Sequence, residues 1–228
     1  MRSIAPDARL RAAAGFVRQG ARLADIGTDH AYLPVSLLRA GRISFAVASD
    51  ISAGPLAHAR ETAAFAGIGE ERLSLVQTDG LAGIEAYRPT DIAVCGMGGE
   101  NIVKILAAAP FVKDPEIRLI LEPMSRAYVL REYLAAEGFL IEREALARVK
   151  RHVYTCLCVR YTGEPYALTK IEAELGAYHL TDGRDNPLFR AYVEEHLSSV
   201  RRRVTGLRIG GEDNLAEEEL LRQMEGCL

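Results

Sequence analysis

Acidic and glycine residues occupy the turn that follows the first apolar segment of the sequence. The segment Leu23–Ile26 ends at Gly27, and a helical pattern begins a few residues later. This is the strand–turn–helix arrangement on which nucleotide cofactors bind in doubly wound α/β folds. Read as Asp-x-Gly-x-Gly-x-Gly, the series that starts at Asp25 has Asp29 in place of its second glycine and Ala31 in place of its third.

The extra carboxylate indicates which nucleotide cofactor suits this turn. Asp29 would face the pyrophosphate of NAD or FAD, and like charges in a tight turn repel each other. The methionine half of S-adenosylmethionine carries an ammonium and a sulfonium, which an acidic turn attracts. The turn therefore favours a methyltransferase over a nicotinamide oxidoreductase. We expect Asp25, Gly27 and Asp29 to bind this cofactor.

Acids also follow the second and third apolar segments. Asp50 lies some two dozen residues beyond Gly27, where a carboxylate accepts hydrogen bonds from the two ribose hydroxyls. Asp79 is placed to accept from the adenine amino group, and Gly80 lets the backbone approach the ligand closely. Simpler explanations are a helix cap for Asp50 and ordinary turn chemistry for the Asp-Gly pair.

The fourth and fifth apolar segments end where an acceptor would meet the methyl group. The fourth runs into Gly96-Met97-Gly98-Gly99, which allows a flat ring to lie against the backbone, and the fifth runs into Glu122-Pro123. We expect Gly96 and Met97 to contact the cofactor. The expected acceptor contacts are Gly98, Gly99, Glu122 and Pro123. The alternatives are a glycine turn without a direct role and a salt bridge from Glu122 to Arg126 or Arg131.

Three residues of the first turn are candidates for the catalytic step. Asp29 is placed to stabilise positive charge that develops on an acceptor base. Histidine side chains commonly carry protons in catalysis, so His30 is either a proton carrier or a packed supporting residue. The ring of Tyr32 offers a stacking surface for a nucleobase, or else packs in the core.

The elements that must position these residues alternate along the chain. Strands are predicted over Leu23–Ile26, Phe45–Ser49, Leu73–Gln77, Ile92–Cys95 and Ile117–Leu121, then over Phe139–Leu146 and His152–Tyr161 around a polar turn. Helices are predicted over residues 6–18, 33–40, 53–66, 99–109 and 126–137. Such alternation requires a parallel sheet with right-handed crossovers. Five parallel strands completed by a hairpin give the seven-stranded, Rossmann-like plan of class I S-adenosylmethionine-dependent methyltransferases.

A helical region follows Gly163-Glu164-Pro165. Helices are predicted over residues 167–178, 187–205 and 215–223, with Pro187 in a first turn and Gly210-Gly211 as a break. We therefore divide the chain into a Rossmann-like domain, residues 1–163, and a small C-terminal helical domain, residues 164–228. We expect the cofactor site to survive in a chain that ends near Thr162.

Composition narrows the setting in which the chain works. The formal net charge of −3 does not indicate a general nucleic-acid binder, although Arg201, Arg202 and Arg203 and the arginine-rich start of the chain (Arg2 onward) form basic clusters. No signal peptide or membrane-spanning segment is evident. The four cysteines form no Cys-x-x-Cys pair, so we expect no metal site, no disulfides and a reducing cytoplasm. A monomer is expected, with a dimer as the alternative.

Five motifs in order resemble one known family, the bacterial tRNA (adenine-22 N1)-methyltransferases, over about residues 8–162. They are Asp25–Pro34, Ser49-Asp50 with Gly54-Pro55-Leu56, Asp79-Gly80-Leu81, Gly96–Gly99, and Pro123 with Leu130–Leu134. The resemblance implies S-adenosylmethionine as methyl donor and tRNA as acceptor. The chain departs from it at Glu122, where many relatives have glutamine, and at Arg148–Arg151, where many have an acidic-glycine turn.

The sequence thus predicts a methyltransferase acting on N1 of an adenine in tRNA, with position 22 implied by the resemblance alone. Arg201, Arg202 and Arg203 are expected to contact tRNA phosphates from the helical domain. Two alternatives remain open: a small-molecule or protein methyltransferase on the same fold, and a catalytically silent RNA-binding module.

Overall fold

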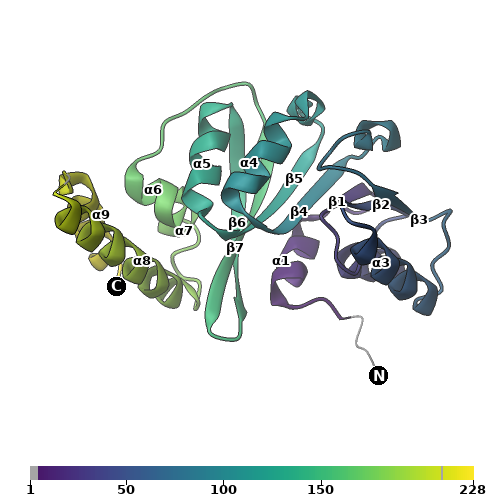
Figure 1. Ribbon diagram of the computed structural model, residues 1–228, viewed down its shortest axis with the longest axis horizontal. Helices are drawn as coiled ribbons and strands as arrows, with labels where there is room; N and C mark the ends of the chain where they lie inside the picture. Colours follow the sequence, from purple (N-terminus) through teal and green to yellow (C-terminus); the bar gives the residue numbers. More distant parts are fainter. Residues whose placement is uncertain (1–4, 212) are drawn as a thin grey trace.

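The computed structural model describes residues 5–211 and 213–228, which contain a single seven-stranded sheet (Figure 1). Arg2, part of the predicted basic cluster, lies outside these residues. The strands are β1 (Arg22–Ile26), β2 (Phe45–Asp50), β3 (Leu73–Gln77), β4 (Asp91–Gly98), β5 (Arg118–Ser125), β6 (Phe139–Val149) and β7 (His152–Tyr161). All seven predicted strands are confirmed, with ends shifted by at most four residues.

The strand order is β3-β2-β1-β4-β5-β7-β6. The first five strands are parallel, and β7 lies between β5 and β6 and is antiparallel to both. The order reverses between β1 and β4, so the carboxyl ends of these two strands form the switch point where doubly wound folds bind ligands. The predicted class I methyltransferase plan is confirmed.

Helices cover both faces of the sheet. They are α1 (Ala8–Phe16), α2 (Tyr32–Arg39), α3 (Ala53–Phe65), α4 (Gly99–Ala107) and α5 (Ala127–Ala136), with short 3-10 turns η1 (Ile84–Tyr87) and η2 (Pro110–Lys113). One core joins α1–α3 to the face that carries Ala46 and Ala48. Val47 points to the other face, where α4 and α5 pack. Because strand side chains alternate between faces, one apolar strand supplies both cores.

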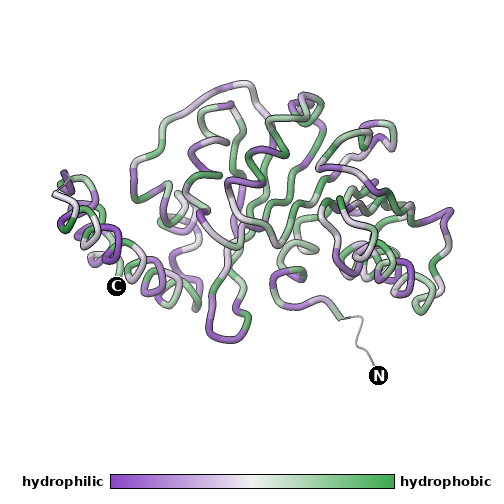
Figure 2. Tube along the Cα trace, in the orientation of Figure 1, coloured by the Kyte–Doolittle hydropathy of each residue, from purple (hydrophilic) through white to green (hydrophobic). Residues whose placement is uncertain are grey.

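The C-terminal helices are α6 (Lys170–Leu175), α7 (Ala177–Leu180), α8 (Phe189–Gly210) and α9 (Leu215–Glu225). Their apolar core includes Leu146 and Val153, which belong to the β6–β7 hairpin. Figure 2 shows the mixed hydropathy of this region, in contrast to the central strands of the sheet, which are largely apolar. The predicted division at residues 163 and 164 stays a prediction, because the helical core shares residues with the sheet.

A buried ionic cluster joins the helices to the sheet. The Arg131 guanidinium on α5 donates to the Glu144 carboxylate at 2.8 and 3.0 Å and to the carbonyls of Ala173 and Glu174 at 2.9 Å. The Tyr192 hydroxyl on α8 lies 3.2 Å from the same guanidinium. Burial raises the pKa of the Glu144 carboxyl, but Arg131 and the His179 ring, whose Nε2 lies 2.9 Å from Glu144 Oε2, lower it to about 2.

The prediction of one continuous helix over residues 167–178 is wrong, because the structure has two short helices there. Gly176 has φ +90° and separates α6 from α7. A side chain there would collide with the Glu144 carboxylate and the Arg131 guanidinium, so the buried cluster requires a glycine at this break. Pro187 also lies two residues before α8 begins at Phe189, and not in its first turn.

Candidate functional site

A hollow of about 290 Å³ opens at the carboxyl ends of β1–β4. Its lining includes five residues that the sequence predicted to bind the cofactor, namely Gly27, Asp50, Asp79, Gly80 and Met97. The remaining lining residues are Ile26, Ser49, Ile51, Thr78, Asn101 and Ile105. Two acids, two glycines with positive φ and an exposed apolar side chain, Ile51, thus surround one space.

The first turn is fixed by hydrogen bonds beneath this hollow. Gly27 has φ +72°, and the amides of Gly27 and Thr28 donate to the Ser49 carbonyl at 2.8 and 2.9 Å. The Thr28 hydroxyl donates to the Asp25 carboxylate at 2.7 Å and accepts from the Ala31 amide at 3.1 Å. Burial raises the pKa of Asp25 to about 6. Asp25 therefore braces the turn and is absent from the described lining of the hollow.

Asp50 bonds to a nearby backbone amide and also lines the hollow. Its Oδ1 accepts from the Ser52 amide at 2.7 Å, but the N-cap of α3 is Ser52 itself, so the alternative explanation of Asp50 as a helix cap is wrong. Ser52 itself makes no side-chain capping bond. Asp50 still lines the hollow, and one carboxylate oxygen has no hydrogen-bond partner among the residues described. Asp79 is exposed at the opposite wall.

Asp29, His30 and Tyr32 lie together but outside the described lining of the hollow. The Asp29 side chain is 73% exposed, and its Oδ2 lies 3.3 Å from His30 Nε2. The His30 ring stacks on Tyr32 at 5.0 Å and on His58 at 4.7 Å, measured between ring centroids. This stacked group, formed by His30, Tyr32 and His58, is partly open to solvent.

Asp29, His30 and His58 also have the composition of a metal site. One ligand atom from each lies within 4.8 Å of the others, and all three residues are at least partly exposed. This is the one such group among the residues described. The expectation that the protein needs no metal stays a prediction.

The Gly96–Gly99 loop is an irregular end of β4. The β4–β5 pairing shifts register on both sides of Met97, and Gly96 has φ +82°. A side chain at Gly99 would collide with the carbonyl oxygen of Arg126, so glycine allows α4 and α5 to start close together. The Met97 side chain lies over Gly27, with Asn101 Nδ2 at 3.3 Å from its sulfur. The loop therefore meets the first turn across the hollow.

Glu122 holds this loop from the neighbouring strand. Its Oε2 accepts from the Gly96 amide at 2.8 Å and lies 3.4 Å from Arg9 Nη1, whereas its buried Oε1 has no partner among the described residues. Burial raises the pKa of Glu122 to about 7, although Arg9 and the Gly96 amide oppose the rise. The suggested partners Arg126 and Arg131 are wrong: they pair with Glu100 and Glu144.

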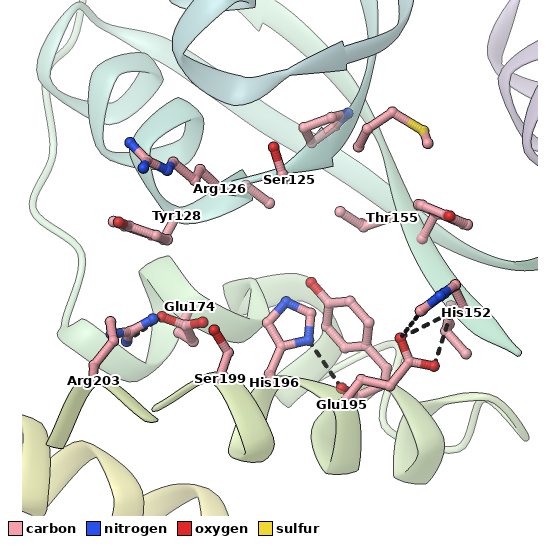
Figure 3. Close-up of a pocket in the computed structure, with 16 residues that line it drawn as sticks. Ser125, Arg126, Tyr128, His152, Thr155, Glu174, Glu195, His196, Ser199 and Arg203 are labelled. Atoms are coloured by element: carbon pink, nitrogen blue, oxygen red, sulfur yellow. Dashed lines mark hydrogen bonds and ion pairs between the residues drawn. The ribbon is translucent and has the colours of Figure 1, made fainter. Parts of the chain in front are cut away.

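A second and larger cavity, here called the β5–α8 groove, lies between the end of β5 and helix α8 (Figure 3). Its volume is about 690 Å³. Ser125, Arg126 and Tyr128 line one wall, and His196, Ser199 and Arg203 line the wall opposite. Pro123 also lines it, together with Met124, Ala127, His152, Val153, Tyr154, Thr155, Glu174, Tyr192 and Glu195. Rings and hydroxyls from both sides thus face a space large enough for a nucleotide.

The three consecutive arginines of α8 occupy different surroundings. Arg203 lies in the groove and pairs with Glu174 at 2.8 Å and Glu217 at 3.0 Å. Arg201 pairs with Glu225 at 2.8 Å on α9. Arg202 is exposed and has no ion pair among the described residues. Their proposed tRNA contacts therefore stay a prediction, with Arg202 as the arginine whose charge is not already paired.

Several residues of the site escaped sequence analysis. Ile51 and Thr78 directly neighbour predicted residues, and Asn101 lies two residues beyond Gly99, so a search along the chain for nearby side chains would have found them. Arg9 is 113 positions from Glu122, and no local pattern links them. His58 comes from the middle of α3, where its ring reads as an ordinary surface residue.

Residues 7–157 match the family model described as a methyltransferase domain. Among curated proteins, the chain is 34% identical to the Bacillus subtilis tRNA (adenine(22)-N(1))-methyltransferase over 149 residues. That alignment covers 65% of this chain and 62% of the length of the B. subtilis enzyme.

Solved structures show the same similarity over almost the whole chain. The B. subtilis m1A22 tRNA methyltransferase superposes with a TM-score of 0.80 at 25% identity, covering 98% of this chain and 96% of that one. A Streptococcus pneumoniae protein solved in complex with S-adenosyl-L-methionine gives a TM-score of 0.79 at 29% identity. It covers 93% of this chain and 98% of its own.

Proposed function

Because this chain belongs to the methyltransferase-domain family, we propose that it transfers a methyl group from S-adenosylmethionine to N1 of an adenine in tRNA. The observation that carries the proposal is the hollow at the switch point, where Asp50, Asp79 and the Gly27 turn surround one space. Position 22 is supported by the relatives, whose names specify that adenine.

The residues of the hollow fit S-adenosylmethionine. The free carboxylate oxygen of Asp50 is available for ribose hydroxyls, and Asp79 for an amino group of the adenine ring. Gly27 and Gly80 both have positive φ and leave room for a ligand to approach the backbone. When bound, the cofactor supplies an activated methyl group. The carboxylates hold its ribose and adenine, and the Gly96–Gly99 loop borders the place where the acceptor must lie.

The proposed reaction requires little proton transfer by groups of the protein. Adenine N1 has an in-plane lone pair and carries no proton, so it would attack the methyl carbon directly once the two are aligned. The bond from that carbon to the sulfonium sulfur would break in the same step and leave its electron pair on sulfur. Methylation leaves a positive charge on the ring, and a carboxylate at the site lowers the energy of that charge. Asp29 is the exposed acid of the first turn, and its pairing with His30 keeps it beside the stacked rings of His30 and Tyr32.

The acceptor base must leave its helix before it reacts. N1 lies on the pairing edge of adenine, so a paired base has to be flipped out or come from an unpaired region. The stacked group formed by His30, Tyr32 and His58 offers a ring surface on which a base released from its stack can lie. The proposed enzyme acts in the cytoplasm, as a monomer, and without a metal ion.

The experiment that tests this function is methylation of unmodified tRNA by the purified chain with S-adenosylmethionine. Nuclease digestion and mass spectrometry locate the product, and we expect 1-methyladenosine at position 22. A matched tRNA with guanosine at that position should not react. Methylation at another nucleotide would overturn the position, and no methylation of any tRNA by a chain that binds the cofactor would favour a different acceptor.

A further inference from the structure

Three basic residues without acidic partners gather at the tip of the β6–β7 hairpin. Arg148, Lys150 and Arg151 are exposed, and none forms an ion pair within the part of the chain that is described. The tip appears as a hydrophilic turn that projects beyond the sheet (Figure 2). The α8 arginines Arg201 and Arg203 contrast with it, because each already pairs with a carboxylate.

The strand register places this tip at the edge of the sheet that carries the cofactor hollow. Leu121 of β5 pairs with Leu157 of the antiparallel β7, so the carboxyl end of β5 lies beside the start of β7. Continuing the same register brings Ser125 level with Val153. Lys150 and Arg151 then extend beyond the end of β5 by about 3.3 Å per residue. The cations therefore project past the strand ends where the acceptor enters.

The β5–α8 groove connects the neighbourhood of the Gly96–Gly99 loop with the tip of the β6–β7 hairpin. Its lining begins at Pro123, next to the residue that holds the Gly96 loop, and includes the first residues of β7. The one carboxylate described at the tip end of the groove, Glu195, is engaged by the Val153 amide at 3.1 Å and by His152 at 3.6 Å. Arg151 Nε donates to His152 Nε2 at 3.1 Å, which leaves its charge unpaired with any acid among the described residues. An anion that lies along the groove thus meets cations that no carboxylate neutralises at its outer end.

We propose that the tip of the β6–β7 hairpin, Arg148, Lys150 and Arg151, binds backbone phosphates of the tRNA strand that carries the target adenine. The proposal rests on the proposed function, because it assumes that tRNA is the acceptor. An RNA strand whose target base lies beside the Gly96–Gly99 loop, at the end of β4, would continue across the end of β5, along the β5–α8 groove and onto the tip of the hairpin. Phosphate contacts of this kind position the RNA without reading its sequence.

The test compares two charge-reversed variants. The tip variant carries Lys150→Glu and Arg151→Glu, and the control carries Arg88→Glu and Arg39→Glu. Lys150 and Arg88 share the left-handed conformation, with φ +54° and +50°, so the substitutions are matched in backbone strain. Arg39 ends α2 and Arg88 precedes β4, which places the control at the amino edge of the sheet.

Filter binding of tRNA at several salt concentrations should separate the variants. We expect the tip variant to lose at least tenfold in tRNA affinity, with a log–log salt slope less steep by about 1.5, since each lost phosphate contact removes roughly 0.7–0.9 from it. S-adenosylmethionine affinity and turnover at saturating tRNA should be unchanged. Equal tRNA affinity and salt slope in the tip and control variants would overturn the proposal.

The outcome is distinguishable from a failure of the proposed function. If the wild-type protein methylates tRNA and the tip variant binds tRNA as well as the control does, the proposed function stands and the proposed phosphate contacts are rejected. If only the tip variant loses tRNA binding and the wild-type protein methylates no tRNA, the proposed phosphate contacts stand and the proposed methylation of tRNA is rejected.

Discussion

Asp50 is the side chain on which the proposed cofactor site depends most directly. Asp50→Ala removes the proposed acceptor for the ribose hydroxyls, and hydrogen bonds to a charged group are worth roughly 1.5–3 kcal/mol each. We expect S-adenosylmethionine affinity to fall at least tenfold by calorimetry, with thermal unfolding still cooperative. Asp114→Ala, on the opposite side of the fold before β5, is the control. An unchanged dissociation constant would show that the ribose binds elsewhere.

Asp29 is expected to act on the reaction more than on binding. Asp29→Asn keeps the size of the side chain and removes its charge, so the positive charge on the methylated base loses a stabilising partner. We expect turnover to fall about 10²-fold at saturating tRNA, with tRNA affinity nearly unchanged, as for loss of a group that stabilises transition-state charge. Normal turnover with weaker S-adenosylmethionine binding would instead assign Asp29 to the cofactor's ammonium.

The buried carboxyl of Glu122 gives the fold a predictable pH dependence. Its folded pKa of about 7 exceeds the usual value of 4.5, so between these values the native protein holds a proton that the unfolded chain releases. Stability therefore falls as pH rises through this interval. Glu122→Gln retains an acceptor for the Gly96 amide and should flatten the decline of melting temperature between about pH 5 and pH 8. Asp25 maintains a residual slope, since its pKa is also raised.

An unaltered slope in Glu122→Gln would show that this carboxyl is not protonated in the native state.

At the residue scale, the sequence predicted the acids that follow strands, because strand ends and turn residues are local patterns. It could not predict that Asp25 turns inward to Thr28, or that Glu122 takes Arg9 as its partner. Those contacts depend on how distant segments pack.

At the scale of elements, the starts of α4 and α5 fit together through one glycine. Gly99→Ala would push a methyl group into the Arg126 carbonyl, and such overpacking costs roughly 1–3 kcal/mol. We expect a lower melting temperature and slower methylation, because the Gly96–Gly99 loop shifts with the helix. Gly206→Ala in α8 is the control. It meets open space, and alanine there should stabilise by roughly 0.5–1 kcal/mol. A Gly99→Ala protein as stable as wild type would contradict the close fit.

The elements themselves were predictable to a large degree. Strands such as Leu73–Gln77 and His152–Tyr161 were located to the residue, because apolar runs bounded by turn residues are strong signals. The break at Gly176 was missed, since its cause is a buried ion pair contributed by α5 and β6. The 3-10 turns η1 and η2 have no periodicity from which they could be recognised.

For the whole molecule, the buried cluster changes the expected behaviour of a truncated chain. Ending the protein at Thr162 removes the Ala173, Glu174 and Tyr192 partners of Arg131 and uncovers Leu146 and Val153. Arg131 keeps its ion pair with Glu144, but it loses three hydrogen-bond partners, and hydrogen bonds to a charged group are worth roughly 1.5–3 kcal/mol each. We therefore expect the truncated chain to be largely insoluble, contrary to the sequence-based expectation that it keeps a working cofactor site. Soluble fraction and cofactor calorimetry test this, and a soluble fragment with full S-adenosylmethionine affinity would contradict it.

Within the described residues, no helix is both long and apolar enough to cross a membrane, and all four cysteines are unpaired. The requirement for a metal is a separate question for the whole enzyme. We expect methylation to continue unchanged after exhaustive treatment with a chelator. Loss of activity that zinc restores, in wild type but not in His58→Ala, would assign a metal to Asp29, His30 and His58.

The strand order has a consequence for how the chain is made on the ribosome. Strand β7 is the last to be synthesised, yet it lies inside the sheet between β5 and β6. At about 5–20 residues per second, β5 emerges some seconds before its neighbour and presents an unpaired edge, which is prone to aggregate. The residues that line the proposed cofactor hollow all precede β5 in the chain. They are therefore synthesised well before β7 closes the open edge of β5.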